Sequence, residues 1–142
     1  ILFIGNKVIK DKKLLEVIAS EEHKFWKFIS NKVFLNKNLI DMDIRLLENY
    51  YKNRGYYNVK ILDNFVELDK ENSSFNLTYN IDAGDKFLFN DFSLTLPGYY
   101  SNKDFENINK IFNKNKNKEY SLDIINKILM QKLMRQLLII IN

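Results

Sequence analysis

The stretch from Lys37 to Tyr57, KNLIDMDIRLLENYYKNRGYY, constrains the fold of this chain more than any other segment. Its apolar residues lie three or four positions apart, the spacing of a helix with one buried face: Ile40, Ile44, Leu47 and Tyr51. Gly55 follows where helices commonly end in a left-handed residue, a conformation that glycine adopts without a steric cost. The segment therefore predicts an amphipathic helix, roughly Asn38–Asn53, that stops before Gly55.

After Gly55 the periodicity becomes that of a β-strand. Apolar and polar residues alternate over 57–68, with a slip near Leu62–Asn64 that suggests a β-bulge. Residues 75–82 alternate strictly, which predicts one covered and one solvated face. The polar loop between the two runs, DKENSS, makes them a hairpin.

A short apolar strand, Ile1–Ile4, and a helix over Lys10–Ala19 precede these elements. The order is then strand–helix–helix–strand–strand. It predicts an α+β fold with a mixed three-stranded sheet and both helices on one face. In such a sheet one strand of the hairpin lies at an edge.

The same order begins again after residue 86. We expect a strand over Phe87–Leu96, a capping arrangement at Ser101 and Asp104, and two further helices. These features predict an internal repeat, with one domain over residues 1–86 and a partial second copy over 87–142 that lacks its C-terminal strands. The apolar tail LLIII is either the start of the next strand or a consequence of truncation, because the chain reads as a piece of a longer protein.

Composition and spacing offer no catalytic, cofactor or metal site. The net charge of +4 comes from 19 Lys and 3 Arg scattered among carboxylates, which does not favour a nucleic-acid interface. Without cysteine there is no thiolate site, and His23 has no second ligand at a supporting spacing. Asp41 and Asp43 point about 200° apart on a helix and cannot share a substrate. We therefore expect no enzyme.

Two groups of residues are candidate interaction sites. The first is the strand at the sheet edge, where an extended client chain can add as a further strand through main-chain hydrogen bonds: Tyr57, Val59, Lys60, Ile61 and Phe65. The alternative is an edge protected by Lys60 and the bulge. The second is an aromatic cluster, either an anchor of the connecting segment or an exposed contact for a subunit or client: Phe25, Trp26 and Phe28.

Three features together resemble POTRA repeats of BamA-type outer-membrane assembly factors. They are the Gly5-Asn6 turn, the helix exit LLENYYKNRGYY and the junction IDAGDKF. The resemblance covers Ile1–Lys86 and, less closely, Phe87–Ile128. It fails over Met130–Asn142, so the fold of that segment stays open.

The resemblance implies a β-α-α-β-β repeat on the periplasmic side of the outer membrane, attached to a C-terminal β-barrel that is absent here. It implies as partners unfolded outer membrane protein clients and accessory assembly lipoproteins, and no cofactor. Two other interpretations are the POTRA region of a two-partner secretion transporter and a structural interaction domain of the cell envelope.

Overall fold

A computed structural model of the protein describes residues 1–20, 37–71, 74–98 and 100–141. The chain divides into two compact units. The first consists of Ile1–Tyr51 and Asn58–Gly84, and the second of Lys52–Tyr57 and Asp85–Asn142.

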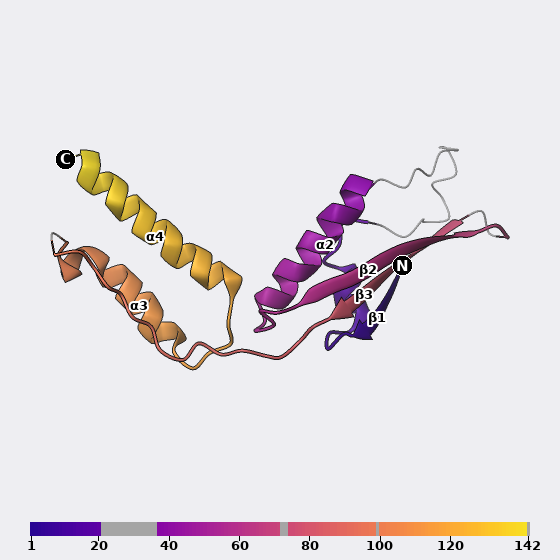
Figure 1. The fold of residues 1–142 in the computed structure, drawn as a ribbon, viewed down its shortest axis with the longest axis horizontal. Helices are drawn as coiled ribbons and strands as arrows, with labels where there is room; N and C mark the ends of the chain where they lie inside the picture. Colours follow the sequence, from indigo (N-terminus) through magenta and orange to yellow (C-terminus); the bar gives the residue numbers. More distant parts are fainter. Residues whose placement is uncertain (21–36, 72–73, 99, 142) are drawn as a thin grey trace. The chain divides into compact units, whose positions relative to one another are not determined.

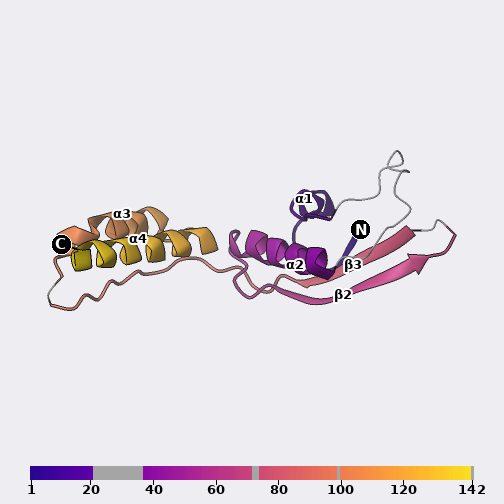
Figure 2. The same cartoon turned by 90° about the horizontal axis from the view of Figure 1, so that it is seen from above.

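The first unit is a three-stranded sheet with two helices on one face. Its elements are β1 (Leu2–Asn6), α1 (Asp11–Leu15), α2 (Lys37–Lys52), β2 (Lys60–Asp69) and β3 (Ser74–Asp82) (Figure 1). The strand order is β1-β3-β2; β1 runs parallel and β2 antiparallel to β3. Figure 2 shows α1 and α2 on the same side of the sheet. The predicted mixed sheet and α+β class are confirmed.

Strand β1 extends to Asn6, so Gly5 and Asn6, predicted as a turn, pair with Ile81 and Asp82 of β3. Two other boundaries in this unit differ from the prediction by three or more residues. Helix α1 ends at Leu15, four residues before the expected Ala19. Strand β2 begins at Lys60 and not at Tyr57, because residues 57 and 58 still belong to the turn after Gly55, where the Tyr57 amide donates to the Gly55 carbonyl at 3.1 Å.

The core of the first unit lies between the helices and the odd-numbered side of β3. It is formed by side chains from β1, β3 and both helices, together with the residue before β2 and the residue after β3: Phe3, Leu14, Ile40, Leu47, Tyr51, Val59, Leu77, Tyr79, Ile81 and Ala83. The rings of Phe3 and Tyr79 stack with centroids 5.8 Å apart. Because Phe3 and Tyr79 are also partners in the strand register, this stacking joins β1 to the central strand.

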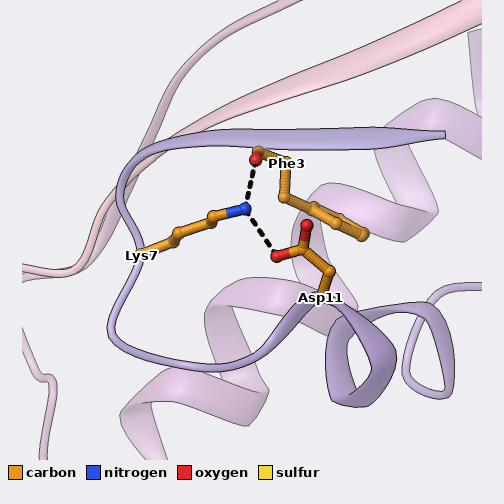
Figure 3. A network of polar contacts seen from close by, with 3 residues as sticks. All are labelled: Phe3, Lys7 and Asp11. Carbon is orange, nitrogen blue, oxygen red and sulfur yellow. Dashed lines mark hydrogen bonds and ion pairs between the residues drawn. The ribbon is translucent and has the colours of Figure 1, made fainter.

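A glycine near the end of β1 and a lysine just after the strand hold the chain where it leaves the sheet. Gly5 has φ +88°, and a Cβ there would lie 2.5 Å from the Ile81 carbonyl oxygen, so only glycine fits. Beyond it, the Lys7 ammonium donates to the Phe3 carbonyl at 2.6 Å and to the Asp11 carboxylate at 2.5 Å (Figure 3). Lys7 thereby connects the strand to the first turn of α1.

A buried carboxylate joins three parts of the first unit. Asp43 of α2 is fully buried; its Oδ1 accepts from the amides of Ala19 (2.7 Å) and Ser20 (3.2 Å), and its Oδ2 accepts from the Tyr79 hydroxyl (2.7 Å). Burial, and then the hydrogen bond to Asp43, raises the pKa of the Tyr79 hydroxyl far above its ordinary value of 10.0. The carboxylate thus fixes the segment after α1, helix α2 and strand β3 to one another.

The second unit contains a short 3-10 helix, η1 (Asn102–Phe105), and two helices, α3 (Glu106–Asn115) and α4 (Leu122–Ile141). The predicted capping arrangement is confirmed: the Ser101 hydroxyl accepts from the Lys103 amide, and the Asp104 carboxylate accepts from the Ser101 amide. Helices α3 and α4 lie side by side in Figures 1 and 2.

The predicted strand Phe87–Leu96 is not formed. Within the described residues this stretch has one isolated bridge, Leu88 to Glu119, with main-chain hydrogen bonds between residues 87–89 and 117–120. Alternating side chains suit a strand, but a strand also needs a partner along its whole length. Here the main-chain pairing with residues 117–120 reaches only residues 87–89, so the rest of the stretch has no such partner among the described residues.

A series of neighbouring aromatic rings runs through the second unit. Successive ring centroids are 4.5–6.3 Å apart, from α3 through the extended stretch to the turn after α2: Phe112, Phe92, Phe89, Tyr120, Tyr57 and Phe87. Such offset and edge-on pairs stabilise beyond their buried area. The apolar tail after residue 130, whose fold the sequence left open, continues α4 to Ile141. None of the described helices is long and apolar enough to cross a membrane.

Replacing the buried carboxylate tests its role. Asp43→Ala removes the acceptor of three donors, so we expect a loss of about 3 kcal/mol in the first unit, or roughly a hundredfold faster exchange of β3 amides. Native-state hydrogen exchange by NMR on the full chain measures this. Asp41→Ala, at an exposed position of the same helix, is the control and should change stability by less than about 0.5 kcal/mol. If Asp43→Ala and Asp41→Ala change the stability equally, the Asp43 carboxylate does not hold these elements together.

The raised pKa of Tyr79 gives a pH dependence with a definite sign. Folded protein keeps a proton that the unfolded chain releases near its ordinary pKa, so this contribution is present below pH 10 and lost above it. Urea unfolding of wild type and Tyr79→Phe, followed by circular dichroism from pH 8 to 11, should show wild type losing its stability advantage above about pH 10. If the stability difference between wild type and Tyr79→Phe stays constant or widens above pH 10, the Tyr79 hydroxyl does not have the raised pKa.

Candidate functional site

Strand β2 lies at an edge of the sheet. Since the order is β1-β3-β2, one side of β2 pairs with β3 and the other has no partner among the described residues. We call this side of Lys60–Leu68 the β2 edge. The opposite edge of the sheet is β1, which has five residues against ten in β2. The β2 edge is therefore the longer template for an added strand.

The register shows where this edge is regular. It shifts between Ile61 and Asp63, which confirms the predicted bulge and leaves Leu62 without a partner. From Asp63 to Asp69, seven consecutive residues pair with β3 without interruption. An added strand thus has a continuous stretch of about 20 Å to pair with beyond the bulge.

The two faces of the β2 edge differ in character. Asn64 and Val66 pair with Tyr79 and Leu77, whose side chains lie in the core, so they are on the helix-covered face. The alternate residues Asp63, Phe65 and Glu67 pair with Asn80, Thr78 and Asn76 on the open face. All three are exposed, and the Phe65 side chain is 40% accessible. The open face therefore carries an aromatic ring between two carboxylates.

The residues predicted for the edge fall in three different places. Lys60, Ile61 and Phe65 lie in β2. Val59 precedes the strand and is buried in the core at 5% exposure. Tyr57 belongs to the second unit, where its ring contacts Phe87 and Tyr120 at right angles. Lys60, which protects the edge in the alternative interpretation, stands before the bulge, outside the regular stretch.

The other predicted cluster, Phe25, Trp26 and Phe28, lies outside the described residues and stays a prediction. Sequence analysis missed Asp63 and Glu67 as edge residues. Their signal was present, because both are two positions from Phe65 and two-residue spacing places them on its face. Among the described residues no group of three His, Cys, Asp or Glu side chains could hold a metal ion.

The turn after α2 belongs to the second unit and is hydrogen-bonded to other parts of it. Gly55 has φ +94°, as its position predicted, and its carbonyl accepts from the Phe87 amide at 2.8 Å. Asn53 Oδ1 accepts from the Asp123 amide at 2.8 Å and from the Ser121 hydroxyl at 3.1 Å. Asp123 is in the first turn of α4, so Asn53 supplies from elsewhere in the chain the acceptor that an N-cap normally provides.

A nearby ion pair lies at the surface of this unit. The Lys86 ammonium donates to the Glu119 carboxylate at 2.5 Å and lies 5.8 Å from the centre of the Tyr56 ring. The hydrogen bond to Glu119 raises the pKa of Lys86. Both side chains are about half exposed, so the pair orients the turn and contributes little to stability.

Comparison with known proteins decides the family. The family model POTRA, described as "Surface antigen variable number repeat", matches residues 1–84. The chain belongs to the POTRA family. The matched range contains the whole sheet and both helices of the first unit, so the β2 edge is an edge of the POTRA repeat.

Known POTRA-containing proteins resemble the chain in sequence and in fold. Outer membrane protein assembly factor BamA of Neisseria meningitidis serogroup B (strain ATCC BAA-335 / MC58) is 24% identical over 85 residues, 60% of this chain and 11% of BamA. A crystal structure of Haemophilus influenzae BamA POTRA3-5 matches with a TM-score of 0.68 and 22% identity, covering 89% of this chain and 48% of that one. The chain thus spans a small part of BamA and about half of the POTRA3-5 structure.

The capping role of Asn53 is open to a direct test. Asn53→Ala removes an acceptor from the first turn of α4, and we expect a local loss of about 1 kcal/mol there. Hydrogen exchange of the amides of Asp123 and its helical neighbours measures it in the full chain. Asn126→Ala, at an exposed position of α4, should leave their protection unchanged or raised. If both variants behave alike, the cap is not formed.

Proposed function

We propose that this chain is the periplasmic POTRA module of an outer-membrane β-barrel assembly factor, and that it acts by binding extended client segments and not by catalysis. Membership of the POTRA family and the likeness to BamA support the first part. The free β2 edge supports the second. Clients of such a factor are unfolded outer membrane proteins, whose segments are extended strands of alternating residues.

The β2 edge carries this proposal because main-chain pairing suits varied clients. Backbone N–H and C=O groups are the same in every sequence, so an edge binds segments with little demand on their side chains. The regular residues from Asp63 to Leu68 offer enough main chain for several hydrogen bonds. Docking of accessory lipoproteins is a further prediction from the family and has no assigned surface.

Paired proline variants test the β2 edge. In an antiparallel strand successive N–H groups point alternately toward the partner and away from it, so of Val66→Pro and Glu67→Pro one removes a hydrogen bond to β3 and the other an outward N–H. The variant that keeps protection of the β3 amides is the informative one. Val66→Ala and Glu67→Ala, which keep the N–H, are the matched controls.

The probe is a synthetic peptide of about ten residues in which Thr alternates with Val or Tyr, the length and pattern of a barrel strand. We expect it to shift the NMR signals of the Asp63–Asp69 amides of the full chain. The folded proline variant should bind at least about fivefold more weakly than its alanine control, since one main-chain hydrogen bond is lost. Unchanged binding in that variant would refute the β2 edge as the client site.

A further inference from the structure

The side chains along the β2 edge add a selectivity that main-chain pairing lacks. We propose that this edge prefers extended segments with a basic residue two positions before and two positions after an apolar or aromatic residue. The inference rests on the proposed function, because it concerns which strands the same edge accepts. The elements that carry it are Asp63, Phe65 and Glu67.

Alternation places these three side chains together. They are two residues apart in a regular strand, so they follow one another on the open face of the sheet at about 7 Å intervals. Side chains directly opposite on an added strand come within about 5 Å of them. A residue opposite Phe65 therefore has its own neighbours on that face opposite Asp63 and Glu67.

Neither carboxylate has a positive charge directly opposite it in the sheet. Their partners on β3 are Asn80 and Asn76, which are neutral. Lys60, the basic residue of β2, stands opposite Asp82, on the same face as Asp63 but one register pair further along, before the bulge. Within the described residues neither carboxylate forms a hydrogen bond or an ion pair. The remaining neighbour is a strand added at the edge, and a cation there meets an exposed carboxylate.

Phe65 provides the apolar centre of the pattern. Its ring is 40% accessible although its register partner, Thr78, is 5% accessible. An apolar side chain directly opposite on an added strand can lie beside the accessible part of this side chain. Cross-strand aromatic and opposite-charge pairs both stabilise a sheet.

The pattern is the same when read in either direction. A basic–any–apolar–any–basic segment presents the same side chains to Asp63, Phe65 and Glu67 whether it adds parallel or antiparallel to β2. Positions between them point to the other face, beside the half-buried Asn64 and Val66, where uncharged residues fit. The edge thus selects by charge spacing without requiring one strand direction.

Three peptides of equal length test this selectivity. Each has a central Phe with Thr at the remaining positions, and they differ only two residues before and after the Phe, where they carry Lys, Gln or Glu. Titration into the full chain, followed by the NMR signals of the Asp63–Asp69 amides, should give the affinity order Lys, Gln, Glu. We expect about threefold to tenfold between successive peptides at low salt, and less at high salt.

Charge variants of the chain locate the effect. Asp63→Lys/Glu67→Lys should reverse the order of the peptides, and the isosteric Asp63→Asn/Glu67→Gln should abolish it. Glu16→Lys/Asp41→Lys makes the same change in net charge on the exposed surface of the first unit and should leave the order intact. Protection of the β3 amides shows that each variant is folded.

The outcomes separate this inference from the proposed function. If all three peptides bind equally at the β2 edge, client binding stands and charge selectivity is overturned. If the preference for Lys survives in both edge variants, it arises elsewhere and the assignment to Asp63 and Glu67 is wrong. If no peptide shifts the Asp63–Asp69 amides, the proposed function falls and this inference with it.

Discussion

The buried carboxylate of Asp43 is the interaction on which the first unit depends. The Tyr79 hydroxyl of β3 and the main-chain amides of Ala19 and Ser20 after α1 all donate to this side chain of α2. Burying a charge is unfavourable unless its lone pairs are used, and here both oxygens are used. The contact joins α2 to the side of β3 that carries the buried Leu77, Tyr79 and Ile81.

Because β3 occupies the centre of the sheet, its two neighbours are both edges, and the chain treats them differently. Strand β1 is short, and Gly5, its next-to-last residue, has a positive φ that departs from strand geometry. Strand β2 is twice as long, and its irregularity lies near its start. Protection by a bulge blocks only the residues around it. Among the described residues, the stretch from Asp63 to Leu68 pairs only with β3, and its exposed carboxylates repel a second copy of the same edge.

Local periodicity predicted what depends on near neighbours. Helix α2, the positive φ of Gly55, the hairpin and the bulge at Leu62 all follow from spacing within a few residues. Asp43 was missed although it sits three residues after Ile40 and four before Leu47, inside the buried stripe, because its partners at Ala19 and Tyr79 are distant in sequence. Phe87–Leu96 failed for the complementary reason: its alternation is correct for a strand, but pairing is a property of what lies beside it.

The chain passes from the first unit to the second within a few residues at the end of α2. Tyr51 ends the core of the first unit, and two residues later Asn53 caps a helix of the second, with Gly55 and Tyr57 both bonded or stacked to residues beyond 85. A left-handed glycine permits this because it redirects the chain within one residue. In the POTRA sequence pattern the glycine therefore does more than end a helix. After this turn Tyr57 packs against Tyr120, and the edge strand β2 starts at Lys60. The position of the glycine therefore determines where β2 begins.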